Sequence, residues 1–493
     1  MERSRISDSG AANATTSRRY FVVTAVAIVA LAVAVRVREA GLTRLWFDEI
    51  YTLWVARLPL DRLLATVAAD VHPPLHFLLV AAWRAIGGES DVWIRSLSVV
   101  AGVATVAALI QLGRTMAGPT AGLLAAALLT LHRTHVFFST ESRAYALLWL
   151  WLTLAVWFAW RWLETRRPRD GAVYVVCAVA ALYTHYLAGI VLAFLALWVL
   201  VDLRGERRHV PAWLALNAAV VVGFAPQLPT LLAQVARNTA EHWLQPPGLG
   251  SLVNLARHSA FGMTALIVPL GLLAALPLLR PSQRRAASLL WTITLLPVLL
   301  CWLLSRAGLH LYSERYMFFV LPGASVLVAA GIAGLRRRWV GVTAALVVLV
   351  AGARSLALSR PLPEAVEQAA ALERLQRRVA GAQTILAADT HSLLFMRHHW
   401  PQHERTRLLW LGAEVPYYDA ALVIPHSWIV GPATLDSLAR MGAPWFAIHT
   451  HNSGSDVSAA IIRIQSLAGP PELTLELVKV WLARSEPGPR SHR

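Results

Sequence analysis

Apolar runs long enough to cross a bilayer recur along the first 357 residues, and this repetition limits the fold more than any other feature. A helix needs about 20 apolar residues to cross roughly 30 Å of hydrocarbon. The sequence therefore predicts a polytopic α-helical membrane protein. We expect about eleven transmembrane helices, at residues 21–35, 93–112, 120–137, 144–162, 171–183, 187–202, 211–228, 261–279, 287–305, 316–334 and 339–357.

The composition agrees with a membrane protein and argues against a nucleic-acid-binding one. The chain is 57% hydrophobic and only 15% charged, far more apolar than a soluble domain. Its net charge of +17 comes from arginines in short clusters between apolar runs, which are topology signals rather than a binding face for nucleic acid. The arginine-rich, nearly lysine-free composition is typical of a GC-rich bacterium, so we expect the protein in a bacterial plasma membrane.

Residues 72–88 decide the topology, because they are apolar enough to be taken for a further span. Their uninterrupted apolar part before Arg84 has only about 11 residues, which is short for a bilayer. If they do not span and the N-terminus is cytoplasmic, every short arginine cluster lies inside, as the positive-inside rule requires. We therefore expect residues 40–92 to form a large first extracytoplasmic loop with surface helices.

The chain outside the spans divides into two further parts. Residues 1–20 are polar and are predicted to form a disordered cytoplasmic tail before the membrane core at 21–357. Residues 358–493 follow the last span and are predicted to form a small extracytoplasmic α/β domain, with a helix at 363–380. Its strand-like runs are "TILAA", "ALVIP" and "WFAIHT".

On this topology, four loops that are distant in sequence place polar and aromatic side chains at the extracytoplasmic surface. Ionisable groups at membrane depth are costly, so they are candidates for function. The candidates are Asp48, Glu49 and His72 in the first loop, Glu141, Arg143 and Tyr145 in the second, His185 and Tyr186 in the third, and Glu314, Arg315 and Tyr316 in the fifth.

Each of these residues also has a structural interpretation. Asp48 and Glu49 can cap a surface helix, and Glu141 can pair with Arg143 at the membrane interface. His185 lies between tyrosines and fits an aromatic belt, while the fifth-loop residues can anchor a helix end to lipid headgroups. Their joint occurrence on one surface favours the functional interpretation.

The residue types suit the transfer of a sugar from a lipid phosphate to a hydroxyl. A carboxylate takes the proton of the acceptor hydroxyl as the new bond forms. The departing phosphate needs guanidinium or imidazole groups, a task that suits Arg143, Arg315, His72 and His185. Nucleotide sugars are not at hand outside the cytoplasm, and the sequence has no Walker or Rossmann fingerprint, so we expect a polyprenyl-phosphate donor in the bilayer.

Several stretches resemble the bacterial branch of the dolichyl-phosphate-mannose protein mannosyltransferase family, within the GT-C superfamily. The resemblance covers residues 20–335, and the order and spacing of the stretches carry it. They are "LWFDEIYTLW", "HPPLHFLLVAAWRAIGG", "IRSLSVVAGVATVAALIQLGRTMAG", "FFSTESRAYALLWL", "YTHYLAGIVLAF" and "ERYMFFVLPG".

This resemblance implies a membrane glycosyltransferase that uses a polyprenyl-phosphate sugar and inverts the anomeric centre. Asp48 matches the catalytic acid of the first loop and Glu49 its partner, while "ESRAY" places Glu141 and Arg143 near the donor phosphate. We expect Glu141 and the remaining candidates to bind substrate: Tyr145, Tyr186, Glu314 and Tyr316. "LHRTH" at 131–135 departs from the family's usual Ser-Pro.

No metal site is predicted, although some GT-C enzymes use a divalent ion, and Mg²⁺ or Mn²⁺ on Asp48, Glu49 and Glu141 stays open. The histidines after residue 357 fit no standard ligand spacing and are expected to be solvated; they include His391, His398, His399, His403, His449 and His451.

The sequence leaves the sugar, mannose or similar, and the acceptor, a glycan, glycolipid or protein, open. A transporter or flippase of lipid-linked or cell-envelope substrates is the alternative. Such proteins usually place their charges near the midplane within repeated halves, and no repeat is evident. A non-catalytic scaffold is a third option, against which the retained acids and arginines count.

Overall fold

The structure is a computed structural model of the 493-residue chain, and it divides into two compact units. We call Met1–Ala40, Val71–Leu79 and Val92–Ser359 the helical unit, and Gly41–Asp70, Val80–Asp91 and Arg360–Arg493 the mixed unit. The structure describes residues 2–238, 246–359, 363–378, 384–387, 390–400, 407–411, 429–430, 433–440, 445–450, 464–468, 473–474 and 478–483.

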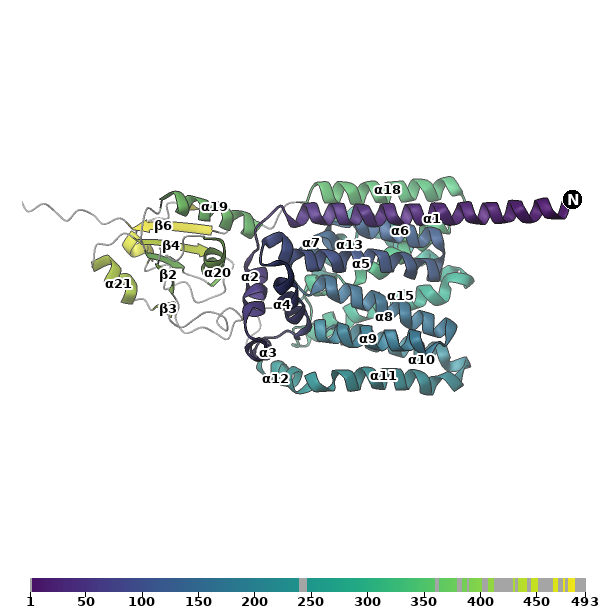
Figure 1. Ribbon diagram of the computed structural model, residues 1–493, viewed down its shortest axis with the longest axis horizontal. Helices are drawn as coiled ribbons and strands as arrows, with labels where there is room; N and C mark the ends of the chain where they lie inside the picture. The colour runs from purple at the N-terminus through teal and green to yellow at the C-terminus, as the bar shows by residue number, and fades with distance from the viewer. Residues whose placement is uncertain are drawn as a thin grey trace, which may run out of the picture. The chain divides into compact units, whose positions relative to one another are not determined.

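The helical unit is a bundle whose long helices run nearly parallel (Figure 1). Prolines in the first turn begin several of them, as expected where a backbone N–H has no partner. The helices are α1 (Glu2–Ala40), α5 (Asp91–Ala117), α6 (Pro119–Thr130), α7 (Arg133–Phe138), α8 (Tyr145–Thr165), α9 (Pro168–Thr184), α10 (Ala188–Asp202), α11 (Val210–Phe224), α12 (Leu228–Asn238), α13 (Leu249–Ser259), α14 (Ile267–Ala275), α15 (Pro281–Arg306), α16 (Glu314–Met317), α17 (Val320–Ala333) and α18 (Arg338–Ala357). Short 3₁₀ turns are η1 (Leu203–Gly205), η2 (Arg207–His209), η3 (Ala225–Gln227), η4 (Thr264–Leu266) and η5 (Leu276–Leu279).

All eleven predicted spans fall on helical segments of this unit. In the described part of the chain, seven helices are long and apolar enough to cross a membrane, and a pair of segments bent by 83° makes an eighth. The predicted span 120–137 is divided between α6 and α7, and α17 has only 14 residues. The helical membrane core is confirmed, whereas the number eleven stays a prediction. The seven helices are Arg18–Ala40, Asp91–Ala117, Tyr145–Thr165, Ala188–Gly205, Arg207–Arg237, Pro281–Arg306 and Arg338–Ala357.

The first helix differs from the prediction at its start. Helix α1 begins at Glu2, so the polar segment predicted as a disordered tail has helical backbone. Residues 1–20 contain no proline, and adding a turn to an existing helix costs much less than starting one. The span itself then extends the polar segment as helix.

Close helix contacts hold the bundle together. Helix α8 packs on α9, α6 on α17, and α10 on α15. Between α5 and α6 the backbones nearly touch, because a Cβ on Gly122 would lie 2.4 Å from the carbonyl oxygen of Ile110. Small residues permit such approach in membranes, where helices associate through packing rather than through the hydrophobic effect.

The mixed unit combines first-loop helices with the C-terminal segment. The helices are α2 (Phe47–Arg57), α3 (Leu60–Ala69), the second part of α4 (Leu75–Gly87), α19 (Pro363–Arg378), α20 (Thr390–His399) and α21 (Ala433–Arg440). With 13 residues, α4 is too short to cross a bilayer unaided, as the sequence predicts. The strands are β1 (Thr384–Ala387), β2 (Arg407–Leu411), β3 (Ile429–Val430), β4 (Trp445–Thr450), β5 (Leu473–Thr474) and β6 (Val478–Ala483).

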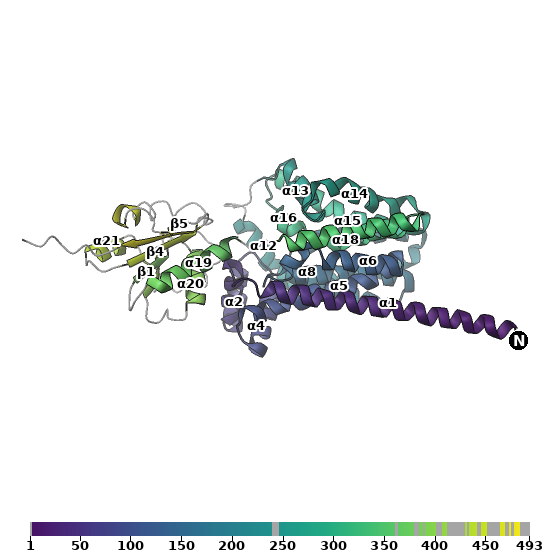
Figure 2. The ribbon, with the colours of Figure 1, turned by 90° about the horizontal axis from the view of Figure 1, so that it is seen from above.

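The strands form one six-stranded sheet in the order β3-β2-β1-β4-β6-β5. Strand β1 is parallel to β2 and β4, while β6 is antiparallel to β4 and β5. Helices α19 and α20 contact each other and the strands (Figure 2). The predicted helix 363–380 corresponds to α19, "TILAA" to β1 and "WFAIHT" to β4, whereas "ALVIP" lies outside the described residues.

Candidate active site

Four of the predicted residues line one pocket in the helical unit. His72, Arg143, Tyr145 and His185 come from three loops and line this pocket together with their neighbours. The other lining residues are Pro73, His76, Phe77, Ala144 and Thr184. The structure therefore brings together side chains up to 113 positions apart (185 − 72) that the topology had placed on one surface.

Helix ends position these side chains. His76 lies in the first turn of α4, two residues after the second of the two prolines that follow His72. Arg143 lies in a tight turn, where its backbone N–H donates to the carbonyl oxygen of Glu141 at 2.8 Å, before α8 begins at Tyr145. His185 directly follows α9 with an extended backbone. Helices α4 and α8 therefore begin at the pocket wall, and helix α9 ends there.

Arg143 supplies positive charge to the pocket. Its Nη2 donates to Nε2 of His72 at 3.2 Å, and the residue as a whole is only 9% exposed. His76 Nε2 donates to the carbonyl oxygen of Ser142 at 3.3 Å, which fixes the turn that holds Arg143. The pocket thus combines a buried cation with imidazoles that orient it, an arrangement suited to an anion.

The buried histidines contribute hydrogen-bonding groups rather than charge. Burial, with the charge of Arg143 next in size, lowers the pKa of His76 to about 3. Burial also lowers the pKa of His185 to about 3, with further lowering by His72, Arg143 and Arg315. Both imidazoles are therefore neutral at neutral pH, so the positive charge that an incoming anion meets comes from the arginines.

The fifth loop adds an aromatic wall beside the pocket. The ring centroids of His185 and Tyr316 lie 5.4 Å apart in an edge-to-face arrangement, and Tyr145 lies 6.4 Å from Tyr316. The guanidinium carbon of Arg315 lies 5.4 Å from the Tyr316 ring centroid. Arg315 and Tyr316 therefore lie next to the residues that line the pocket, as the sequence predicts.

The remaining substrate-binding candidates differ in their surroundings. Glu141 is buried and precedes Arg143 by two residues. Tyr186 donates to Gln234 at 2.7 Å and accepts from Gln227 at 3.0 Å. The Glu314 carboxylate lies 3.7 Å from His258. None of these three is among the described residues that line the pocket, although Glu141 and Tyr186 belong to loops that contribute lining residues.

The two first-loop acids lie in the mixed unit, in the first turn of α2, where their burial and their contacts differ. Glu49 is fully buried, and its Oε2 accepts the backbone N–H of Trp46 at 3.3 Å. This contact satisfies a free donor at the helix start, which is the capping role considered above. Asp48 is partly exposed, and its backbone carbonyl accepts from Thr52 Oγ1 at 2.9 Å. Asp48 is the better candidate for chemistry.

Sequence reasoning missed two features of the helical unit. His76 was visible in "HPPLH" as a second histidine four positions after His72, but carried no assigned role. Arg36, near the end of the first span, is fully buried and donates to Nδ1 of His135 at 2.7 Å. This contact gives the unusual "LHRTH" segment a structural role as the partner of a buried cation.

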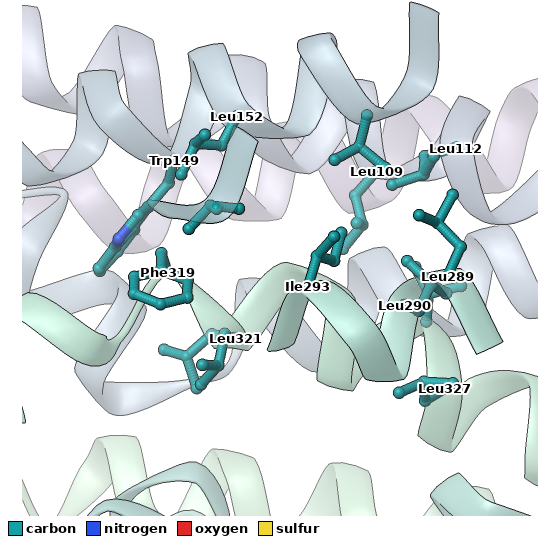
Figure 3. Packing of buried hydrophobic residues seen from close by; sticks show 14 of the residues in the cluster. Leu109, Leu112, Trp149, Leu152, Leu289, Leu290, Ile293, Phe319, Leu321 and Leu327 are labelled. Atoms are coloured by element: carbon teal, nitrogen blue, oxygen red, sulfur yellow. The ribbon is translucent and has the colours of Figure 1, made fainter. Parts of the chain in front are cut away.

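A second, mainly apolar pocket, here called the apolar cavity, is lined by five helices of the helical unit, α5, α8, α10, α15 and α17. Helix α8 lines both spaces, because Tyr145 of the pocket and Trp149, Leu152 and Val156 of the cavity share one helical face. Figure 3 shows Trp149 and Phe319 near each other, with Ile293 beyond them. The cavity lining is Leu112, Trp149, Leu152, Thr153, Val156, Val191, Leu290, Ile293, Thr294, Phe319, Pro322 and Gly323.

Comparison with known proteins supports the family resemblance. Residues 71–231, which contain three of the pocket segments, match the model of the family described as dolichyl-phosphate-mannose-protein mannosyltransferase. The resemblance expected from the sequence is thereby confirmed, and the protein is a multi-pass membrane protein. No curated protein matches the sequence closely enough to count as a relative.

Solved structures show a similar fold at low sequence identity. ArnT from Cupriavidus metallidurans, bound to undecaprenyl phosphate, is similar with a TM-score of 0.61 at 13% identity, covering 93% of this chain and 97% of that one. Its apo structure gives a TM-score of 0.60 with the same identity and coverage. The arabinofuranosyltransferase AftD from mycobacteria gives 0.50 at 13% identity, covering 95% of this chain and 40% of that one.

Proposed function

We propose that this protein is a glycosyltransferase that moves a sugar, mannose or similar, from a polyprenyl-phosphate donor to an acceptor hydroxyl, with inversion at the anomeric carbon. The convergence of His72, Arg143, Tyr145 and His185 on one pocket of a GT-C fold carries this proposal. ArnT, whose structure with undecaprenyl phosphate has the same fold, supports a polyprenyl phosphate as the donor class.

The donor phosphate is assigned to the pocket. A phosphodiester carries one negative charge before transfer, and the phosphate that leaves carries more. Arg143 is held by His72 at 3.2 Å and therefore needs little reordering to meet that charge. Arg315, beside Tyr316 and His185, supplies a second cation.

The lipid chain of the donor is assigned to the apolar cavity. The cavity is lined by Trp149, Leu152, Phe319 and other apolar side chains, and such surface matches an isoprenoid. Because one face of α8 passes from the pocket to the cavity, a single donor can place its phosphate in the first and its chain in the second. A water-soluble nucleotide sugar has no apolar chain that could occupy this space.

The proposed base is Asp48. Its carboxylate removes the proton of the acceptor hydroxyl while the hydroxyl oxygen bonds to the anomeric carbon. The bond from that carbon to the phosphate oxygen breaks, and polyprenyl phosphate leaves with the electron pair. One displacement on the face opposite the leaving group inverts the centre. Glu49 is assigned to holding the start of α2 through the N–H of Trp46.

We assign the reaction to the extracytoplasmic face of a bacterial plasma membrane, since the arginine clusters then lie inside. The acceptor is assigned only as a hydroxyl of a glycan, glycolipid or protein. In this proposal protein groups stabilise the leaving phosphate, and the use of a divalent ion such as Mg²⁺ or Mn²⁺ stays open.

The test is transfer of radiolabelled sugar from synthetic polyprenyl-phosphate donors by the purified protein in proteoliposomes with membrane acceptors. Label in an acceptor, with release of polyprenyl phosphate, is the expected result. Solute or lipid movement across the bilayer without transfer would establish the transporter alternative. If the protein showed no transfer and no transport with any of a panel of lipid-linked sugars, the result would establish a non-catalytic scaffold.

A further inference from the structure

Two C-terminal histidines meet an aspartate from the region before the second span. Asp91 begins α5, while His398 and His399 end α20. His398 Nε2 lies 3.6 Å from an Asp91 carboxylate oxygen, and the ligating atoms of all three residues lie within 4.8 Å of one another. All three belong to the mixed unit. The histidines expected to be solvated are instead enclosed, with His399 only 7% exposed.

The contacts around this cluster set the protonation of its members. His399 Nε2 lies 2.9 Å from the carbonyl oxygen of Leu45, and a carbonyl only accepts, so Nε2 carries the hydrogen. A neutral His399 therefore keeps its lone pair on Nδ1. Asp91 accepts the N–H of Leu45 on Oδ2 at 3.2 Å, while its Oδ1 faces His398.

This is the outer arrangement that metal ligands require. A ligating histidine usually donates its second ring nitrogen to a backbone carbonyl or carboxylate, which fixes the tautomer and the ring. Here, backbone groups of one residue, Leu45, serve both His399 and Asp91. A simple ion pair between His398 and Asp91 would need neither the second histidine nor its fixed tautomer.

We propose that Asp91, His398 and His399 bind a divalent transition metal of the Zn²⁺ class. Two imidazoles and one carboxylate are the mixed nitrogen and oxygen set that Zn²⁺ takes, whereas Mg²⁺ and Ca²⁺ favour oxygen alone. A tetrahedral Zn²⁺ with bonds of about 2.0 Å separates its ligand atoms by about 3.3 Å. The 3.6 Å between His398 and Asp91 is already close to that spacing. Water completes the fourth position.

The site has a consequence for the first loop that rests on the proposed function. Leu45 precedes Asp48 by three residues, and the ring of Phe47 stacks on His391 of α20 with centroids 3.6 Å apart. A metal at Asp91, His398 and His399 would therefore fix the backbone that leads to the proposed base. Asp91, His398 and His399 are positioning residues in this scheme.

The test is metal binding by the purified full-length protein in detergent, after chelation and reloading with Zn²⁺ or Co²⁺. We expect one Zn²⁺ per chain by elemental analysis, and the Co²⁺ absorption of a four-coordinate site. His398→Ala and Asp91→Asn should each weaken Zn²⁺ binding by about tenfold or more. His209→Ala, which removes a histidine that lies 3.6 Å from Glu206 in the helical unit, should leave binding unchanged.

A cysteine variant separates ligation from a general loss of structure. His398→Cys keeps a metal ligand, so its Co²⁺ form should show a thiolate charge-transfer band that the natural chain, with only Cys177 and Cys301 buried in the helical unit, lacks. Absence of this band in a protein that elutes normally, or equal Zn²⁺ retention in His398→Ala and the natural chain, would overturn the proposal. Zn²⁺ binding should be unchanged in Asp48→Asn, so failure of the proposed base and failure of the metal site give different results.

Discussion

The two groups of candidate residues are held in different ways. In the helical unit, Arg143 is fixed by near neighbours, through a turn and the imidazole of His72. In the mixed unit, the segment before Asp48 is held by α20, through His391 against Phe47 and His399 against Leu45. The proposed anion-binding pocket therefore belongs to the helical unit, while the placement of the proposed base depends on a segment more than 300 positions later.

The largest effect should come from the proposed base. Asp48→Asn keeps the shape of the side chain but cannot accept the proton, so transfer should fall by about 10³-fold with normal membrane insertion. Radiolabel transfer in proteoliposomes measures it. Asp61→Asn, an exposed acid of the neighbouring helix α3, is the control and should transfer normally. Near-normal turnover of Asp48→Asn would remove Asp48 from the mechanism and erase the contrast between the two groups.

The next effect concerns the pocket. Arg143→Ala removes the cation assigned to the donor phosphate, so kcat/KM for the donor should fall by about 100-fold, in line with a charged hydrogen bond of 1.5–3 kcal/mol. Arg133→Ala removes an exposed arginine of α7 and serves as the charge-matched control. Unchanged donor kinetics in Arg143→Ala would mean that the pocket binds something other than the phosphate.

A smaller effect should come from filling the apolar cavity. Val191→Trp places a large ring among Trp149, Leu152 and Phe319, so the KM for a long-chain donor should rise by about tenfold, within the range of overpacking costs. A short-chain donor analogue should be affected less. Val176→Trp on α9, where the side chain is 64% exposed, is the matched control. Equal effects on both donors would contradict the assignment of the lipid chain.

The smallest expected effect is on the pH dependence of stability. Burial lowers the pKa of His76 from its ordinary 6.5 to about 3, so the folded state favours the neutral ring. This contribution is complete above pH 6.5 and is lost as the pH falls toward 3, because the unfolded chain then binds the proton more readily. The apparent melting temperature should therefore drop less steeply below pH 6.5 in His76→Gln than in the natural chain or in His209→Gln. Parallel curves of melting temperature against pH for His76→Gln and the natural chain would show that His76 does not contribute to the pH dependence of stability.

The spans and much of the pocket were predictable because their signals are local. Hydropathy marks each helix, and the arginine clusters fix which helix ends share a surface, so His72, Arg143 and His185 could be grouped without any contact information. The hydrogen bond between Arg143 and His72 could not be predicted, since it depends on how two turns pack. Asp91 and His399 were beyond reach, because residues so distant in sequence have no spacing pattern that connects them. The contact of Glu49 with the backbone N–H of Trp46 at the start of α2 follows from its place in the first turn, whereas its role in the chemistry stays a prediction.

On the proposed assignment of the donor, the single face of α8 that borders both spaces sets the distance between the phosphate and the lipid chain. From Tyr145 to Val156 the backbone advances by about 16 Å, at 1.5 Å per residue. The phosphate and the lipid chain of a bound donor would therefore contact residues that lie a fixed distance apart. Lengthening the isoprenoid would therefore increase the affinity for the donor only until the chain reaches Val156. Further isoprene units would extend into the surrounding bilayer and leave the affinity unchanged.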